Sequence, residues 1–394
     1  MRKVLYFHYQ RSERDGSFVH TREFEAAFRR LCAPKQIAFD VVAPPLVVPE
    51  FWQPGFFARM RSALAKLYLR DVKALLQQWR RSGEELEILR REQPEIVLTR
   101  FDDNTLSILW ACRKLGIPVV IEVNAPERDE LDAAYRQLPI FRRLFSNRHA
   151  LELADGAFTV SEAISRPLRA TANGKPVLTI PNGVDVTRFD PALSPLPVRR
   201  RFEIPEGHVT FGFVGSFAPW HGLDMLVDAF SVLIAEGLPV HLLLVGQANA
   251  QWQALLDRLR SPALAPHVSL AGFVQPQDIP PYLAAMDVTV LPNAAYYCSP
   301  LKLFEYMAMA RPTVAANIEP VAAMLEDGRE GMLFPVGDVA ALTARLRQLV
   351  EQPELRRSLG DGARSRMEQE FTWDHNAARV YSLLEQVLLR KSAA

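Results

Sequence analysis

The segment VTFGFVGSFAPWHG, residues 209–222, is the clearest indication of the fold, because an apolar run leads into a glycine-containing loop and a helical pattern follows to about residue 235. This order is typical of a parallel strand and its crossover helix. Gly215 lets the backbone come close to a ligand, and His221 and Gly222 stand near a helix start, where anions bind. The loop lacks the GxxxxGK[ST] and GxGxxG patterns of other nucleotide-binding folds. It predicts either a phosphate-binding loop or a loop whose glycine serves packing alone.

The same alternation of strand and helix patterns extends along the chain. Short β-rich apolar runs, separated by segments of helical period, occur at 3–8, 37–43, 95–99, 118–123 and 156–160, and then at 209–214, 240–245, 267–271, 287–291 and 312–315. Two such series predict two α/β domains, each with a doubly wound parallel sheet that binds ligands at the carboxyl ends of its strands. Prolines between the series predict an N-terminal domain at 1–190, a linker at 191–200 and a C-terminal domain at 201–374.

Length and composition exclude several classes of protein. The chain has 394 residues, of which 49% are hydrophobic and 23% charged, with a formal net charge of +1, so it is expected to be globular and to bind no nucleic acid. Its cysteines, Cys32, Cys112 and Cys298, are too far apart for a disulfide framework or a CxxC metal site, which fits a reducing cytoplasm. No apolar run is long enough for a signal peptide or a membrane span, so we expect any membrane contact to be peripheral.

A second helix start, SPLKLFE, carries charge. Ser299 is a good N-cap residue and Pro300 suits the first helical position, which would leave the N–H groups from Leu301 onward free. Lys302 places a cation in the first turn, where the helix dipole disfavours it, and a bound phosphate would explain that placement. Glu305 lies on the same face as Lys302, within reach of the hydroxyls of a ribose. The segment predicts a nucleotide site; the alternative is an ordinary capped helix with one Lys–Glu pair.

These segments, in this order, resemble the C-terminal domain of the group 1 (family 4) glycosyltransferases, which have the GT-B fold. The resemblance is carried by LLLVG at 242–246, VSLAGFV at 268–274, AMDVTVLP at 285–292, and PNGVD at 181–185 with Phe189. Within the family the chain is most similar to a bacterial branch with EVNAP, GSF.PWHG and SPLKLFEYMA motifs, matched at 122–126, 215–222 and 299–308. The resemblance implies two Rossmann-like domains facing across a cleft, with a C-terminal helix at about 375–390 packing back on the N-terminal domain.

The resemblance also implies a retaining, metal-independent transfer of a hexosyl residue from a UDP- or GDP-linked sugar to a lipid-linked or saccharide acceptor, in glycoconjugate or exopolysaccharide synthesis. It implies no cofactor besides the nucleotide sugar, which is a co-substrate. The candidate catalytic residues are Lys302, His221 and Arg100. The donor-binding residues that it implies are Gly16, Gly215, Ser216, Gly222, Gly246, Gly272, Phe273, Val274, Ser299, Pro300, Leu301, Lys302 and Glu305.

Three positions depart from the family pattern. Ser216 and His221 stand where many relatives have Arg and Lys, so stabilisation of the leaving phosphates would fall on Lys302, helix N-termini and a protonated His221. Tyr297 replaces the first glutamate of the family's E-x7-E motif, so Tyr296, Tyr297 or a backbone group would contact the donor sugar instead. These departures affect the identity of the sugar more than the class of reaction.

Acceptor-side candidates fall in the N-terminal half, where strands end or the first helix begins. They are Glu122, Asn124, His20 and Arg22, with Arg100 near them. Their alternative role is to anchor loops or the domain interface by hydrogen bonds. Asp102 and Asp103 together with Glu122 could suggest a paired-carboxylate glycosidase site. A retaining transfer needs no such pair, because a departing phosphate oxygen can take the acceptor proton.

The pattern of residues 51–81 predicts a basic amphipathic helix with aromatic residues at its start. Such a helix could lie on an anionic leaflet and receive a lipid-linked acceptor, or its apolar stripe could simply cover the N-terminal sheet. We therefore expect a cytoplasmic enzyme that works at the inner face of the cell membrane, and the sequence does not predict its oligomeric state.

Two alternative functions are compatible with the sequence. One is a catalytically weak or silent nucleotide-sugar binding protein, and the other is a GT-B epimerase or phosphorylase.

Overall fold

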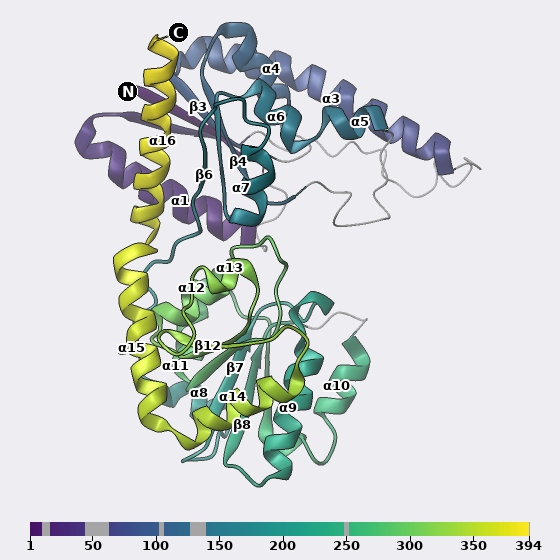
Figure 1. Ribbon diagram of the computed structural model, residues 1–394, viewed down its shortest axis with the longest axis vertical. Helices are drawn as coiled ribbons and strands as arrows, with labels where there is room; N and C mark the ends of the chain where they lie inside the picture. The colour runs from purple at the N-terminus through teal and green to yellow at the C-terminus, as the bar shows by residue number, and fades with distance from the viewer. Residues whose placement is uncertain (10–15, 44–62, 102–105, 127–138, 248–251, 394) are drawn as a thin grey trace. The chain divides into compact units, whose positions relative to one another are not determined.

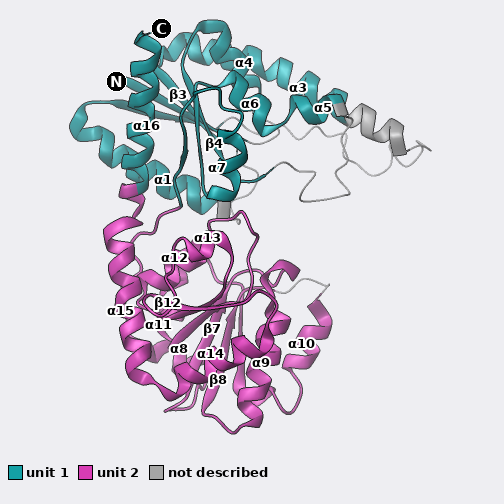
Figure 2. Ribbon diagram, viewed as in Figure 1, with its two compact units in different colours: residues 1–181, 376–394 teal, residues 182–375 magenta. Residues whose placement is uncertain are grey.

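The chain folds into two compact units, as a computed structural model shows (Figures 1 and 2). The structure describes residues 1–9, 16–43, 63–101, 106–126, 139–247 and 252–393. Unit 1 comprises residues 1–181 and 376–394, and unit 2 comprises residues 182–375. Each unit has a six-stranded parallel sheet among its described residues, flanked by helices, which confirms the predicted α/β class.

Unit 1 has the strand order β2-β1-β3-β4-β5-β6. The strands are β1 Lys3–Phe7, β2 Ala38–Val42, β3 Ile96–Phe101, β4 Val119–Val123, β5 Gly156–Thr159 and β6 Val177–Thr179. The helices are α1 Gly16–Cys32, η1 Ala33–Lys35, α3 Ala63–Glu92, α4 Leu106–Leu115, α5 Pro139–Leu144, α6 Asn147–Leu153, α7 Glu162–Arg169 and most of α16 Trp373–Ala393. The strands β3 and β4 are buried almost throughout, as expected of a parallel sheet covered by helices.

Unit 2 has the strand order β12-β11-β10-β7-β8-β9. Its strands are β7 Val209–Val214, β8 Val240–Val245, β9 Val268–Gly272, β10 Val288–Leu291, β11 Thr313–Ala316 and β12 Gly331–Phe334. Its helices are α8 Leu196–Arg201, η5 Pro219–His221, α9 Leu223–Ala235, α10 Gln253–Leu259, η7 Ala265–His267, η8 Pro276–Asp278, α11 Pro280–Ala284, α12 Leu301–Ala308, α13 Glu319–Ala322, α14 Val339–Glu351 and α15 Pro353–Glu370. The order reverses between β7 and β10, the switch point where sheets of this kind bind ligands.

The sheet of unit 2 separates two hydrophobic clusters. Alternate side chains of β8 enter opposite clusters, Leu242 and Leu244 on one face and Leu243 and Val245 on the other. This alternation follows from the two-residue period of a strand. Because both faces are buried, the strand reads as a continuous apolar run, which is why the sequence predicts it well. The sequence patterns do not predict β6 or β12, which are only three and four residues long.

The predicted linker at 191–200 belongs to unit 2, and the first division falls at Pro181–Asn182 instead of residue 190. Phe189 lies in the unit 2 core, and its carbonyl accepts a hydrogen bond of 2.6 Å from Arg364 Nη1. The prolines of this stretch begin α8 instead of extending a linker, since Pro195 is the N-cap residue of that helix. The second division lies within α16, so that residues 376–394 join unit 1.

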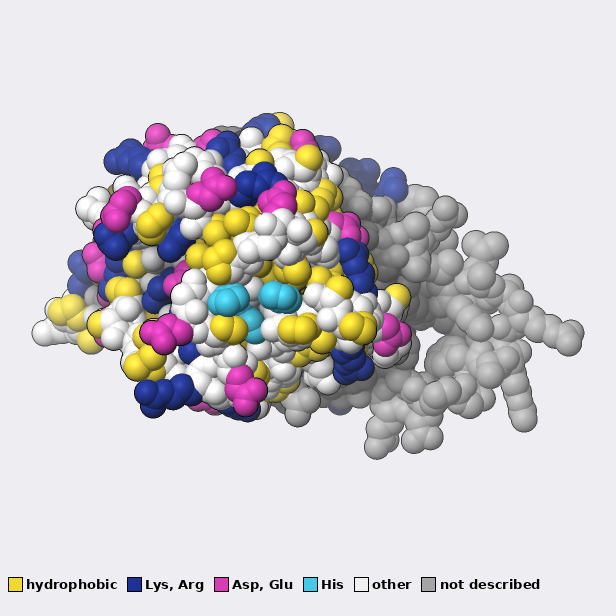
Figure 3. Space-filling model, turned by 90° about the horizontal axis from the view of Figure 1, so that it is seen from below, with side chains coloured by type: hydrophobic (Ala, Val, Ile, Leu, Met, Phe, Trp, Pro, Cys, Tyr) yellow, Lys and Arg dark blue, Asp and Glu magenta, His cyan; other side chains and the backbone are white. Residues whose placement is uncertain are grey.

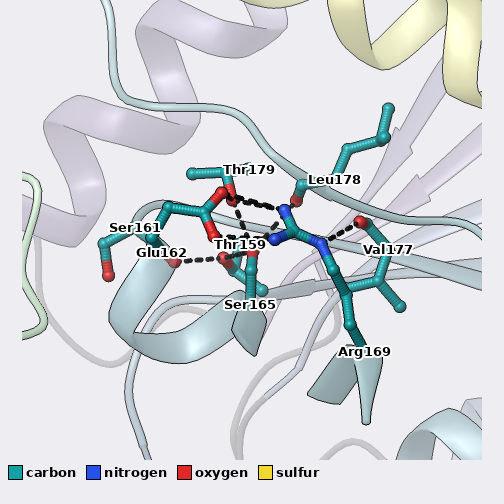
Figure 4. Close-up of polar contacts among 8 residues, drawn as sticks. All are labelled: Thr159, Ser161, Glu162, Ser165, Arg169, Val177, Leu178 and Thr179. Atoms are coloured by element: carbon teal, nitrogen blue, oxygen red, sulfur yellow. Dashed lines mark hydrogen bonds and ion pairs between the residues drawn. The ribbon is translucent and has the colours of Figure 1, made fainter. Parts of the chain in front are cut away.

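A polar network ties α7 to β5 and β6 in unit 1 (Figure 4). Arg169 donates to Glu162 Oε2 at 2.7 Å and to the Val177 carbonyl at 3.0 Å. Thr159 Oγ1 lies 2.6 Å from Ser165 Oγ. These groups satisfy one another's hydrogen bonds, so this cluster holds the edge of the sheet together. Within the described part of the chain, no helix is both long enough and apolar enough to cross a membrane.

Candidate functional site

The sheet of unit 2 opens at the carboxyl end of β7. β7 pairs with β8 along its whole length, but with β10 only at Phe211 and Gly212. The loops that follow β7 and β10 meet at this opening, since a Cβ on Gly222 would lie 3.2 Å from Asn293 Cβ. The predicted βα unit at 209–235 therefore places its loop at the switch point of the sheet.

The ammonium group of Lys302 fills this opening. Lys302 Nζ lies 3.3 Å from His221 Nε2, 3.5 Å from His221 Nδ1 and 4.5 Å from the centroid of the Phe213 ring. A Cβ on Gly215 would lie only 2.6 Å from Nζ, and Gly215 has a φ of +146°, which favours glycine. The loop after β7 thus needs glycine at 215 so that the backbone and the ammonium can lie side by side.

Lys302 is mostly buried and has no carboxylate partner among the residues that the structure describes. Burial lowers the pKa of Lys302 to about 8, against the weaker opposing effects of Cys298 and Glu305. Burial, and then the charge of Lys302, lower the pKa of His221 to about 3. His221 is therefore neutral in the free site, because burial and the neighbouring ammonium disfavour a second cation.

A cation in these surroundings is unfavourable until an anion joins it. Removal from water destabilises the charged form, and only an opposite charge or good hydrogen bonds offset that cost. Around Lys302 the partners are an imidazole and an aromatic ring, neither of which carries negative charge. The arrangement can therefore bind an anion such as a phosphate without first breaking an ion pair.

Glycines also bring the ends of β7, β8 and β9 together. The Gly215 N–H donates to the Val245 carbonyl at 2.9 Å, and the Gly246 N–H donates to the Gly272 carbonyl at 2.9 Å. A Cβ on Gly246 would lie 1.8 Å from the Gly215 carbonyl oxygen, so no other residue fits there. Phe273 follows with half of its side chain exposed, and Val274 packs against the core. Three of the predicted donor-binding glycines, Gly215, Gly246 and Gly272, thus lie along the carboxyl edge of the unit 2 sheet.

The predicted N-cap role of Ser299 is wrong. α12 begins at Leu301, with Pro300 as its N-cap residue and no side-chain cap. Ser299 Oγ instead accepts from the Asn182 N–H at 3.1 Å, and the Ser299 carbonyl accepts from Asn182 Nδ2 at 2.6 Å. Buried amide groups require hydrogen-bond partners, and Ser299 supplies them to Asn182 instead of capping the helix. The first turn of α12 consequently presents backbone N–H groups that no side chain caps.

Glu305 lies one turn from Lys302, as predicted, and is partly exposed. Its Oε1 atom lies 3.9 Å from Arg188 Nη2, and the Arg188 guanidinium lies 4.6 Å from the centroid of the Phe189 ring. The sequence patterns do not single out Arg188, although it directly precedes Phe189, the phenylalanine that follows the PNGVD motif. Tyr296 and Tyr297 come just before α12, with their ring centroids 5.3 Å apart, and Tyr296 is exposed.

In unit 1, Glu122 gathers two of the acceptor-side candidates. Glu122 Oε1 lies 2.7 Å from His20 Nε2 and accepts from Asn124 Nδ2 at 2.6 Å, while Tyr6 donates to Oε2 at 3.4 Å. Burial opposes the charged carboxylate, but His20, Arg100 and Asn124 outweigh it and lower the pKa of Glu122 to about 2. The side chain of Glu122 is fully buried, so it can orient its partners but cannot itself touch a ligand.

The remaining candidates fall in several places. Arg100 pairs in register with Glu122 across β3 and β4, whereas Arg22 lies on the surface beside Glu23 at 2.8 Å. Ser216 is exposed in the loop after β7. Gly16 is the first residue of α1. Asp102, Asp103 and residues 51–62 of the predicted amphipathic helix lie outside the described residues.

The helix α3 buries polar side chains that the sequence patterns did not point to. Gln78 accepts from the Ser107 N–H at 2.9 Å, and Glu85 accepts from Ser107 Oγ at 2.9 Å and from the Tyr9 hydroxyl. Burial raises the pKa of Glu85 to about 7. The seven-residue spacing of Asp71, Gln78 and Glu85 is the signal that could have shown this face. Leu76 and Trp79, two apolar residues of the predicted amphipathic helix at 51–81, are 61% and 75% exposed.

Histidine side chains also gather on one face of the molecule (Figure 3). His208 and His267 precede β7 and β9, and His241 lies on β8 between them. Burial, and then the two neighbouring histidines, lower the pKa of His241 to about 4. No group of three His, Cys, Asp or Glu side chains in the described ranges is arranged to hold a metal ion. These histidines lie at the amino end of the sheet, away from Lys302.

Comparisons with known proteins match both halves of the chain. The sequence model of the family described as "Glycosyltransferase Family 4" matches residues 46–188, and that of "Glycosyl transferases group 1" matches residues 208–352. Phosphatidyl-myo-inositol mannosyltransferase of Mycobacterium leprae is 28% identical over 296 residues, which are 74% of this chain and 73% of the relative. D-inositol 3-phosphate glycosyltransferase of Kineococcus radiotolerans is 28% identical over 64% of this chain, which spans 61% of that relative's length.

Solved structures match the chain over almost its whole length. Sucrose-phosphate synthase from Thermosynechococcus elongatus has a TM-score of 0.70 at 18% identity, with 99% of this chain and 100% of that chain covered. Anabaena Alr3699/HepE in complex with UDP has a TM-score of 0.69 at 16% identity, with 98% and 100% covered. At these identities the likeness shows the fold alone.

Proposed function

Because the chain belongs to the group 1 (family 4) glycosyltransferases and has the GT-B fold, we propose that it transfers a hexosyl residue from a UDP- or GDP-linked sugar. The acceptor is a lipid-linked or saccharide hydroxyl, the anomeric configuration is retained, and no metal ion is needed. The observation that carries the proposal is the mostly buried ammonium of Lys302, which has an imidazole and an aromatic ring as neighbours and no carboxylate among the described residues. The donor diphosphate supplies the missing negative charge.

In the proposed reaction, the bond between the sugar C1 and the diphosphate oxygen breaks while a bond from C1 to the acceptor oxygen forms on the same face. The acceptor proton passes to the departing phosphate oxygen, so no side chain has to act as a strong base. Negative charge grows on the diphosphate as it leaves, and Lys302 and the uncapped N–H groups of α12 stabilise it. Lys302 supplies the positive charge that a divalent cation provides in other transferases.

The rest of the donor is assigned to neighbouring groups. Glu305 would accept hydrogen bonds from the ribose hydroxyls, and the backbone from Gly272 to Val274 would border the base. HepE, with the same fold, has been crystallised with UDP and with UDP-glucose, which supports a nucleotide sugar as the donor here. In unit 1, Arg100, His20 and Asn124 are proposed to contact the acceptor, with Glu122 holding His20 and Asn124 in place.

The exposed face of α3 supports a peripheral contact with the cytoplasmic leaflet. Leu76 and Trp79 are exposed, and so is Arg80, which directly follows Trp79. Apolar and basic side chains on one exposed helix favour an anionic lipid surface, which would bring the enzyme to a lipid-linked acceptor. Sedimentation with phosphatidylglycerol vesicles tests this contact. Trp79→Ser should reduce the bound fraction severalfold, and equal binding by wild type and variant would contradict it.

A thermal-shift screen of UDP-, GDP- and ADP-sugars tests the proposed donor. We expect one base to raise the Tm of the wild type and to leave Lys302→Met unshifted. Incubation of the bound donor with acceptors, and proton NMR of the product anomer, then test transfer and retention. Binding without slow donor hydrolysis or transfer would favour the alternative of a silent nucleotide-sugar binding protein, which the neutral His221 and the exposed Ser216 motivate. Turnover with free phosphate and no nucleotide would favour a phosphorylase.

A further inference from the structure

The last residue of β7 lacks a partner strand on one side. β10 leaves the ladder after Gly212, so Val214 has no β10 residue to pair with. The hydroxyl of Tyr306 takes the place of that strand. It accepts a hydrogen bond of 2.7 Å from the Val214 N–H and donates one of 3.3 Å to the Val214 carbonyl. Tyr306 is fully buried, so this pair of hydrogen bonds is shielded from solvent.

The opposite side of the same turn is also fixed. The Gly215 N–H donates to the Val245 carbonyl of β8 at 2.9 Å. Tyr306 therefore fixes Val214 on one side, and β8 fixes the next residue, Gly215, on the other. Between these two anchors the backbone at Gly215 comes so close to Lys302 that a Cβ would lie 2.6 Å from Nζ. A small rotation of the Val214 peptide would therefore change the distance between the loop and the ammonium.

Tyr306 and Lys302 lie one turn apart on α12, on the same face of that helix. The helix α12 thus places the ammonium of Lys302 beside the Gly215 loop, and through Tyr306 it also bonds to β7, the strand that precedes this loop. We propose that Tyr306 is a positioning residue for the donor site, which holds the Val214 peptide so that the Gly215 loop and Lys302 keep the spacing that a diphosphate requires. The proposal rests on the proposed function of the same site.

The variant Tyr306→Phe keeps the ring and removes only the hydroxyl. It leaves the buried N–H and carbonyl of Val214 without partners, and such groups are unfavourable in a protein interior. The chain offers a matched control in Tyr282, which is also buried in unit 2 and accepts a hydrogen bond of 3.0 Å from Arg201. Tyr282 lies on α11 and its hydroxyl bonds to Arg201 of α8, so Tyr282→Phe removes a hydroxyl that holds a different part of unit 2.

The experiment measures both variants beside the wild type. Calorimetry gives the Kd for UDP, GDP and inorganic pyrophosphate, and hydrogen exchange with mass spectrometry follows the peptide 209–222. We expect Tyr306→Phe to raise the Kd for pyrophosphate and for the accepted nucleotide about tenfold, and to speed exchange at Val214–Ser216 at least tenfold, as loss of one buried hydrogen bond predicts. Tyr282→Phe should stay within about twofold of the wild type in both measurements.

Two results would overturn the proposal. One is a Tyr306→Phe protein that binds and exchanges like the wild type, and the other is an equal loss of binding in both variants, which would indicate general destabilisation. If the wild type binds neither nucleotide nor pyrophosphate, the proposed function fails. Exchange at Val214–Ser216 then still decides whether Tyr306 holds the loop: unchanged exchange in Tyr306→Phe overturns the anchoring, and fast exchange supports it.

Discussion

The carboxyl ends of the two sheets differ in whether their buried charged side chain has compensating partners. In unit 1, the fully buried carboxylate of Glu122 has His20, Asn124 and Tyr6 as hydrogen-bonding partners. In unit 2, the mostly buried ammonium of Lys302 lies against an imidazole and an aromatic ring, with no carboxylate partner in the described part of the chain. The same edge of the same kind of sheet therefore holds a compensated charge in one unit and an uncompensated charge in the other.

This difference indicates which buried charge stabilises the fold and which one is available to bind a ligand. A buried charge with partners stabilises the fold as long as both partners remain, and it offers little to a ligand. A mostly buried charge without a counter-charge reduces the stability of the free protein and favours a ligand that supplies one. We therefore expect the anionic donor to bind in unit 2 and Glu122 to position its neighbours in unit 1, and each prediction below tests one of these expectations.

The largest effect is expected from Lys302→Met. The variant keeps a long side chain but removes the ammonium that lies beside Gly215. We expect kcat to fall about 10²- to 10³-fold, because one oriented donor to a developing anion contributes that much. A coupled assay for released nucleoside diphosphate measures it, with Lys302→Arg as the charge-conserving control. Wild-type turnover in Lys302→Met would contradict the role of the ammonium.

In unit 1, Glu122→Gln should lower the free energy of unfolding by about 3 kcal/mol, because it leaves the partners of a buried charge unsatisfied. Since the pKa of Glu122 falls from 4.5 to about 2 on folding, its contribution is present above pH 4.5 and lost as the pH falls towards 2. Urea unfolding at pH 7 measures the loss. Glu152→Gln is the matched control, since that carboxylate is exposed and pairs with Arg148 at 3.3 Å. A loss no greater than in this control would show that Glu122 is not structural.

Glu305→Ala should weaken the binding of UDP or GDP about tenfold, because a charged acceptor would be lost from the ribose hydroxyls. Pyrophosphate carries no ribose, so its Kd should stay the same as in the wild type. Calorimetry with both ligands separates the two parts of the site. Equal weakening of both would show that Glu305 acts on the charge around Lys302 instead of on the ribose.

The smallest expected effect is on pH dependence. The free site lowers the pKa of His221 to about 3 and that of Lys302 to about 8, and a diphosphate favours the charged form of both. Binding should therefore take up protons, and the affinity for a nucleotide sugar should rise severalfold as the pH falls from 8 to 6 and decline above pH 8. Calorimetry in buffers of different ionisation enthalpy counts the protons. His221→Gln should keep only the decline above pH 8, and a flat wild-type profile would contradict the prediction.

The parts of the fold that sequence predicts are those fixed by local pattern. Ten strands appear as apolar runs in the sequence, which burial of parallel strands favours. The two strands that the patterns miss, β6 and β12, are short and lie at sheet edges. Lys302 and Gly215 could be predicted because a cation in a first turn and a glycine after a strand are local features. Long-range partners could not be predicted: Ser299 bonds to Asn182, and Tyr306 bonds to Val214. Such pairings depend on tertiary packing, which no local spacing encodes.

The most direct test compares two lysines with opposite surroundings, Lys302 and Lys175. Lys175 Nζ donates to the carbonyls of Leu151, Glu152 and Ala154 at 2.9, 2.9 and 2.6 Å, so it is compensated where Lys302 is not. Each lysine is changed to Met, and thermal unfolding is followed at pH 7 with and without the nucleotide sugar that binds the wild type.

We predict that Lys302→Met leaves the Tm of the free protein unchanged or raised, because it removes a desolvated cation, and abolishes the stabilisation by ligand, about 2.7 kcal/mol at a concentration of 100 Kd. Lys175→Met should lower the Tm of the free protein and keep the stabilisation by ligand. The proposed role of Lys302 in donor binding is contradicted if Lys302→Met lowers the Tm as Lys175→Met does and is still stabilised by the nucleotide sugar.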